Sequence, residues 1–525
     1  MKSIKKYIGV SIVGIAFTCI VSSCDKYLDT LPDNRTELHN ASDVSKLLVS
    51  AYSTSYPAYL TEMESDNTDD NIDDNWTAVD RFQRQAYEWD DITETTSDDD
   101  TPQKLWSNYY MVFSTANTAL EFINTQDTTQ YEPQIGEALI TRAYAGFMLS
   151  TVFCNAYDAT TASAQLGLPY PTKTETSPGS KYERGTLDQL YQKIAADIEK
   201  AIPLISDNYD QPKYHFTRTA AYAFAARFYL YYQKYDKAIA YATKALGSNP
   251  DNKLRDWAAW DALTENDQIR PNAYTASNVA SNFLLITANT VIGAVCGPYE
   301  VGCKYTHGVA VARSETLMSN GPWGSSSSAF NYGYFYNPSL AQYCVRKLGY
   351  YFEYTDRTDN VGIVHSTFSA FNAEETLLCR AEAYALQQKY TLALNDINAI
   401  LSKFSVGGIS LSMAGIQNFY GSINYYTPTS PTVKKQFHTS FAIESTTEEP
   451  LLQCIMHLRR LLTLHEGLRW QDIKRYGMVI YRRQITNGVV TAVTDTLSAN
   501  DPRRAIQLPQ DVIAAGMQEN PRITK

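Results

Sequence analysis

Two stretches of this 525-residue chain share one spacing of small and aromatic residues, and they decide its fold. Residues 219–250 read TAAYAFAARFYLYYQKYDKAIAYATKALGSNP, and residues 374–403 read EETLLCRAEAYALQQKYTLALNDINAILSK. Ala226 and Ala238 of the first stretch recur as Ala381 and Ala393, each 155 residues later. Small residues allow two helix backbones to approach closely, so each stretch predicts a pair of packed antiparallel helices.

This spacing is typical of tetratricopeptide repeats, which need neighbouring helices to bury their faces. Further helices are predicted over residues 106–123, 134–153, 187–202 and 451–476. Thr186 and Gln189 form a capping-box pattern before the third of these. We therefore expect a mainly α fold, a tetratricopeptide-like scaffold with helical repeats over about residues 104–250 and 371–478. Two unrelated amphipathic hairpins are the alternative.

Two irregular segments interrupt this pattern, at about residues 63–102 and 251–369. The second contains Gly321-Pro322-Trp323-Gly324 and the aromatic run NYGYFYNP at residues 331–338, with little helical periodicity. Long irregular segments inside compact proteins are usually functional. These insertions are therefore expected to form a large loop-rich ligand-binding region.

The overall composition limits the class of ligand. The chain carries 56 acidic against 45 basic side chains, a net charge of −11, which argues against nucleic acid as a partner because phosphates need a basic face. It also carries 39 tyrosines, whose rings are apolar while their hydroxyl groups stay hydrated. That combination suits polar recognition surfaces.

Aromatic side chains in the irregular segments are the candidate ligand contacts. A flat ring can pack against the apolar face of a pyranose while neighbouring polar groups bind its hydroxyls; peptides can use the same surface. The predicted ligand-binding residues are Trp76, Trp323, Tyr332, Tyr334 and Tyr336. The alternative for any one tyrosine is a packing role.

Motifs that would indicate catalysis are absent from the sequence. It contains no P-loop, no G-x-S-x-G and no G-x-G-x-x-G, and His465-Glu466 lacks the second histidine of a helical zinc site. We predict no catalytic residue, no metal ligand and no cofactor. Two alternatives stay open: calcium bound by the Asp-rich segment 63–102 in place of a solvated acidic loop, and a glycosidase with two carboxylates across a cleft.

The first residues resemble an export signal. Lys2, Lys5 and Lys6 precede a short apolar stretch over residues 7–21, which ends at Ser22-Ser23-Cys24. Small residues before a cysteine are typical of a bacterial lipoprotein signal, in which Cys24 is acylated after cleavage. We predict a signal peptide over residues 1–23 and lipidation at Cys24; an ordinary cleaved signal is the alternative.

The other cysteines are widely scattered. Cys154, Cys379 and Cys454 lie in helical apolar patterns and are expected to be buried. Cys296 and Cys303 lie close enough in sequence for a local disulfide in an exported protein, which the sequence does not decide.

Residues 459–477, RRLLTLHEGLRWQDIKRYG, resemble the signature helix of the SusD/RagB family. Further similar motifs follow the family order, at residues 24–29, 106–117, 136–144, 380–384 and 508–521. His465 departs from the aromatic or apolar residue usual in the family. On a continuous helix Arg469 would lie three residues from both Glu466 and Asp472 and bridge to them, while Gly477 suits a left-handed helix end.

The resemblance implies a SusD-like fold over residues 24–525 as a single domain. Members of this family are outer-membrane lipoproteins of Bacteroidetes. It further implies a non-enzymatic, lipid-anchored cell-surface protein that captures glycan and delivers it to a SusC-like TonB-dependent transporter. Oligopeptides are the alternative ligand. The repeat face would contact the transporter barrel and the loop-rich face would hold the ligand.

Replacing Cys24 with alanine tests the lipid anchor. One acyl chain binds membranes only marginally, so we expect two or three chains on this cysteine. In a Bacteroidetes host, Cys24→Ala should therefore move the protein from the membrane fraction to the soluble fraction. Unchanged detergent partitioning of the variant would refute the assignment.

Overall fold

The computed structural model describes residues 38–71, 81–93, 99–175, 181–296, 304–338 and 340–522. Ser45–Lys525 form one compact unit, separate from Met1–Val44. The predicted signal peptide, Cys24, Trp76 and Cys303 lie outside the described residues, so the anchor and the disulfide stay predictions. None of the helices in the described ranges is both long and apolar enough to cross a membrane.

Helices dominate the fold, as predicted. The longer ones are α5 (Pro102–Ile123), α6 (Glu132–Phe153), α7 (Leu187–Ala201), α8 (Arg218–Tyr231), α9 (Tyr235–Leu246), α15 (Ala373–Ala385), α16 (Tyr390–Phe404), α17 (Met413–Ser422) and α18 (Glu448–Leu462). The shorter ones are α2 (Ala41–Leu48), α3 (Ala58–Glu64), α4 (Arg81–Tyr87), α10 (Trp257–Asp261), α11 (Ile269–Tyr274), α12 (Ile292–Val295), α13 (Val309–Ser314), α14 (Ser326–Ala329), α19 (Arg469–Arg475) and α20 (Gln510–Ala514). Single 3₁₀ turns are η1 (Val49–Ala51), η2 (Thr128–Tyr131), η3 (Pro212–Tyr214), η4 (Pro250–Asn252) and η5 (Pro502–Arg504).

The strands form four small sheets in the described part of the chain. They are β1 (Asp69–Asn71), β2 (Asn282–Asn289), β3 (Tyr305–Thr306), β4 (Asn320–Gly321), β5 (Gly324–Ser325), β6 (Tyr334–Asn337), β7 (Gln342–Val345), β8 (Tyr351–Asp356), β9 (Val361–Asn372), β10 (Ile480–Thr486) and β11 (Val489–Leu497). Their orders are β11-β10-β1-β3, β2-β9-β8, β4-β5 and β6-β7. All neighbours are antiparallel except β1 and β10, which pair in parallel.

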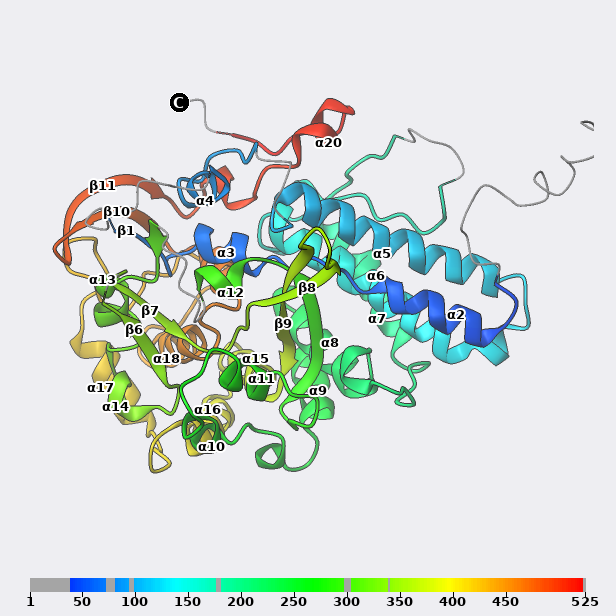
Figure 1. The fold of residues 1–525 in the computed structure, drawn as a ribbon. Coiled ribbons are helices and arrows are strands. Elements are labelled where there is room, and N and C mark those ends of the chain that lie inside the picture. Colours follow the sequence, from blue (N-terminus) through cyan, green and yellow to red (C-terminus); the bar gives the residue numbers. More distant parts are fainter. Residues whose placement is uncertain are drawn as a thin grey trace, which may run out of the picture. The chain divides into compact units, whose positions relative to one another are not determined.

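The two predicted helix pairs are α8–α9 and α15–α16, and α9 also packs on α15 (Figure 1). The turns between the paired helices are equivalent, since Gln233 and Gln388 have left-handed φ angles of 59° and 58°. Ala238 and Ala381 are fully buried at the helix contacts. Helices α5, α6 and α7 pack in series and supply the expected neighbours, and the predicted capping box begins α7.

The predicted continuous helix over residues 451–476 is wrong. Helix α18 ends at Leu462 and α19 begins at Arg469. Between them His465 and Gly467 have φ angles of 70° and 77°. A Cβ at Gly467 would lie 2.6 Å from the Cα of Ala58, so only glycine permits this close approach to α3.

This break redirects the side chains of the signature segment. Glu466 accepts hydrogen bonds from Tyr274 and Lys347 at 2.8 and 3.0 Å, and Arg469 donates to Asp66. The predicted bridges from Arg469 to Glu466 and Asp472 are therefore not formed. Gly477 does end α19 in the left-handed region, with φ 58°, as expected.

The segment at residues 251–369, predicted to be irregular, contributes most of the sheet β2-β9-β8, which its sequence pattern does not predict. Strand β2 is buried along nearly its whole length, and β9 is buried towards its C-terminal end. Strands covered on both faces lack the alternation of polar and apolar residues that reveals a strand. Cys154, Cys379 and Cys454 are buried, as predicted.

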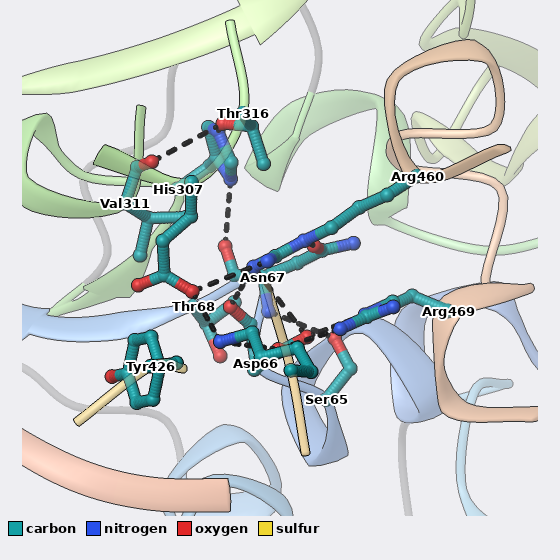
Figure 2. A network of polar contacts seen from close by, with 12 residues as sticks. Ser65, Asp66, Asn67, Thr68, His307, Val311, Thr316, Tyr426, Arg460 and Arg469 are labelled. Atoms are coloured by element: carbon teal, nitrogen blue, oxygen red, sulfur yellow. Dashed lines mark hydrogen bonds and ion pairs between the residues drawn. The ribbon is translucent and has the colours of Figure 1, made fainter. Parts of the chain in front are cut away.

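A buried cluster of charges joins distant parts of the chain (Figure 2). Arg469 donates to both carboxylate oxygens of Asp66 at 2.7 and 2.9 Å. Glu315 pairs with Lys435, Arg460 and Arg483 at 2.7, 3.2 and 3.0 Å. Lys435 also lies 3.3 Å from Asp66, so the two carboxylates share their cations. We call Asp66, Glu315, Lys435, Arg460, Arg469 and Arg483 the charge cluster.

The cations keep these carboxylates ionised despite burial. Burial alone would raise the pKa of Glu315, but Lys435, Arg483 and Arg460 lower it to about 2. Next to the cluster, His307 is held between the Asn67 carbonyl and the Thr316 hydroxyl at 2.7 and 2.8 Å (Figure 2). Burial lowers the pKa of His307 to about 4, so this ring is neutral at pH 7.

Part of the acidic segment therefore has a structural role. Asp66 and Asp69 are bound by arginines, and Asp70 lies 3.3 Å from Lys304. Within the described ranges, no group of three or more His, Cys, Asp or Glu side chains is arranged to hold a metal ion.

We expect Ala238→Leu to lower the free energy of unfolding by about 1–3 kcal/mol, because a larger side chain overpacks the contact between helices. Ala240→Leu is the matched control, since Ala240 is exposed on the same helix. Urea unfolding of both variants measures the effect. Equal stability of the two would mean that this helix contact is wrongly placed.

Glu315→Gln should lower the free energy of unfolding at pH 7 by about 3–5 kcal/mol, because three buried cations lose a shared partner. The pKa of Glu315 lies below its unfolded value, so its contribution is complete above about pH 4.5 and is lost as the pH falls towards 2. The difference between parent and variant in urea titrations should shrink over this range. Glu353→Gln, at an exposed carboxylate of β8, is the control. A pH-independent difference would contradict the role of Glu315.

Candidate ligand-binding surface

Four tyrosines form a continuous row on the β6–β7 hairpin. The ring centroids of Tyr332 and Tyr334 are 6.0 Å apart, those of Tyr334 and Tyr343 5.9 Å, and those of Tyr343 and Tyr336 4.5 Å. Tyr334 and Tyr336 share a face because alternate strand residues do, and Tyr343 lies directly opposite Tyr336 in the register. We call these four residues the tyrosine row.

The row runs from the core to the solvent. Tyr332 and Tyr343 are 1% and 4% exposed, whereas Tyr336 is 39% exposed and Tyr334 is intermediate. The buried rings thus hold the others in place. The outer end of the row, at Tyr336, is exposed to solvent.

One segment of chain anchors both the row and the charge cluster. The Tyr332 hydroxyl donates to the Leu317 carbonyl at 2.6 Å, and the Tyr343 amide donates to the His307 carbonyl at 2.9 Å. Leu317 follows Glu315 by two residues. Ion pairing at Glu315 therefore fixes the backbone on which the row rests.

Arg346 partly covers the opposite face of the hairpin, where Phe335 is half-buried. The guanidinium of Arg346 lies 4.2 Å from the ring centroid of Phe335 and is itself buried. Its nearest carboxylates are Glu265 and Asp267, at 3.4 and 3.7 Å. The most exposed residue of β6, Tyr336, lies on the tyrosine face of this hairpin.

The hydroxyl groups of the two buried row residues, Tyr332 and Tyr343, stay protonated at neutral pH. Burial raises the pKa of Tyr332 well above its ordinary value. Burial also raises the pKa of Tyr343, an effect that Tyr336 reinforces and Arg313 opposes. These side chains therefore act through their ring faces and as neutral hydrogen-bonding groups.

The structure brings three of the five predicted ligand residues together, namely Tyr332, Tyr334 and Tyr336. Trp323 is 7% exposed and packs between Phe330 and His457, at centroid distances of 5.0 and 4.8 Å. Its indole N–H donates to Ser326 at 3.0 Å. The glycines around Trp323 suggested a loop, yet Gly321 leaves the space that this ring fills.

Sequence reasoning missed Tyr343. It lies in the stretch QYCV, whose strand register with β6 cannot be read without the pairing. It also missed Phe352 and Tyr354 on β8, which are 44% and 51% exposed. Their alternation with Glu353 was the available signal.

An open groove lies on the helical scaffold. This groove of about 360 Å³ is bordered by Ala195 and Ala196 of α7 and by Tyr229, Tyr232, Lys234 and Lys237. Glu199 at its side accepts hydrogen bonds from Tyr229, Lys237 and Tyr241 at 2.5, 2.7 and 2.8 Å. We call this the repeat groove.

Comparison with known proteins connects this architecture to a family. Residues 26–230 match the model of a SusD-like family described as "Starch-binding associating with outer membrane". The SusD-like protein P38 of Formosa agariphila is 25% identical over 284 residues, which cover 50% of this chain and 51% of that protein. The chain thus spans about half the length of this curated relative.

Solved structures share the fold across nearly the whole chain. A putative sugar binding protein from Bacteroides vulgatus superposes with a TM-score of 0.64 at 17% identity, covering 93% of this chain and 99% of that one. A SusD superfamily protein from Bacteroides thetaiotaomicron gives 0.62 at 17% identity, with coverage of 92% and 100%. The motifs in order, the family-model match over residues 26–230, the SusD-like relative and the shared fold support the SusD/RagB resemblance that the sequence predicts.

Proposed function

We propose that this protein is a lipid-anchored receptor on the outer face of the outer membrane, which captures glycan and passes it to a SusC-like TonB-dependent transporter. The observation that carries the proposal is the tyrosine row. Its outer rings are exposed, and its inner rings are fixed by the core. A sugar would meet a preformed surface and little ordering would be needed on binding.

The chemistry of the row favours binding over catalysis. Tyr334 and Tyr336 offer apolar ring faces for a pyranose, and their hydroxyl groups can hydrogen-bond its alcohol groups. Glu466, the carboxylate of the signature segment, is already held by Lys347 and Tyr274. We therefore propose that the glycan leaves the protein intact.

The repeat groove is our candidate for contact with the transporter. It is bordered by α7 and by the first helix pair, and its border combines aromatic rings with small residues and two lysines. Such surfaces accept segments of other proteins. The anchor at Cys24 would hold the protein at the membrane beside its partner.

Isothermal titration calorimetry with a panel of plant and host glycans, and with peptide pools in parallel, tests the ligand class. Glycan binding, with a labelled glycan recovered intact, supports the proposal. Binding of peptides alone would replace glycan by oligopeptide as the cargo, and release of shortened sugars would indicate a hydrolase. Co-purification with a barrel transporter from native membranes tests the partner.

Tyr336→Ala and Tyr334→Ala should each weaken glycan binding by about 1–3 kcal/mol, or roughly fivefold to 150-fold in Kd, because each removes an accessible stacking ring. Tyr214→Ala is the matched control, since Tyr214 is 38% exposed and Tyr336 39%. Trp76→Ala tests the remaining predicted ligand contact, Trp76, which lies outside the described residues. If both row variants bind like the control, the row is not the glycan site.

A further inference from the structure

We propose that the tyrosine row takes an acidic glycan, one whose sugars carry carboxylate or sulfate groups, and that Arg313 is the residue that selects it. This inference rests on the proposed function and names the chemical class of ligand for the same site. It predicts a preference that ring stacking alone would not produce.

Arg313 lies at the edge of the row. It is in the last turn of α13, and α13 packs against β7, the strand that carries Tyr343. The positive charge of Arg313 acts on the Tyr343 hydroxyl, which also donates to the sulfur of Met318 at 3.6 Å. The ring centroids of Tyr343 and Tyr336 are 4.5 Å apart, so a sugar on the exposed ring of Tyr336 would lie beside the side chain on which Arg313 acts.

The charge of Arg313 is exposed and uncompensated within the described part of the chain. Its side chain is exposed, and no described carboxylate forms an ion pair with it. The other arginines near the hairpin differ in both respects. Arg270 and Arg346 are buried, and each lies within 4 Å of an aspartate or glutamate, at 3.8 and 3.4 Å.

An arginine in this position matches the needs of an anionic sugar. Its planar guanidinium binds carboxylates and sulfates through two parallel hydrogen bonds, whereas a neutral sugar needs no cation. The chain as a whole carries a net charge of −11 and repels anions at long range. A local cation beside the stacking rings offsets that repulsion where the ligand binds.

The test compares acidic glycans with their neutral counterparts by calorimetry on the folded protein. Suitable pairs are polygalacturonate with its methyl ester, and a sulfated galactan with its desulfated form. The acidic member of at least one pair should bind about tenfold more tightly, and added salt should reduce this preference. Arg313→Gln should remove the preference and leave binding of the neutral member unchanged.

Two variants keep the result interpretable. Arg313→Lys retains the charge but not the paired donors, so it should keep part of the preference. Arg357→Gln removes an exposed arginine in the turn between β8 and β9 and should change nothing. Arg313 lies on the surface, so melting temperatures should stay at the parent value.

The outcomes separate this inference from the proposed function. If Tyr336→Ala weakens binding of both members of a pair while Arg313→Gln leaves their ratio unchanged, the row is the glycan site and the anionic preference is wrong. Equal binding of acidic and neutral members by the parent also overturns the inference. If no glycan binds, the proposed function and this inference fail together.

Discussion

The ion pairs around Asp66 and Glu315 are the constraint on which the rest of the structure depends. Six charged side chains from segments far apart in the sequence are buried together, and each needs the others to remain ionised away from water. Removing one leaves its partners uncompensated. Tyr332 of the tyrosine row is hydrogen-bonded to the Leu317 carbonyl, two residues after Glu315. The ion pairs of Glu315 therefore help to hold the candidate binding surface in place.

Local sequence patterns predicted the helical scaffold because the helix contacts within each repeat join residues that are close in sequence. The 155-residue spacing of Ala226 and Ala381, and of Ala238 and Ala393, reports helix contacts made within each pair. Nothing local distinguishes β2 from a buried helix, because both of its faces are covered. The break at Gly467 also depends on a distant partner, since it follows from close contact with α3.

The candidate site was predictable in part for the same reason. Aromatic residues among asparagine and glycine indicated the hairpin that carries the tyrosine row, and Tyr334 and Tyr336 are partly exposed on it. Composition could not separate them from Trp323, whose ring enters the core over Gly321. Nor could it find Tyr343 or Arg313, which join the surface through strand pairing and helix packing. Side-chain exposure and strand pairing depend on the tertiary structure, so composition alone does not reveal them.

The pairing of Asp66 with Arg469 spans 403 residues, and this separation governs the order of folding. Asp66 is synthesised first, and it stays without this partner until most of the remaining chain has been made. The repeat hairpins can form early because their contacts are local, whereas the sheet of β1 with β10 and the charge cluster can close only after the C-terminal segment has been released. Folding of this protein should therefore end with a slow step that joins the two ends of the compact unit.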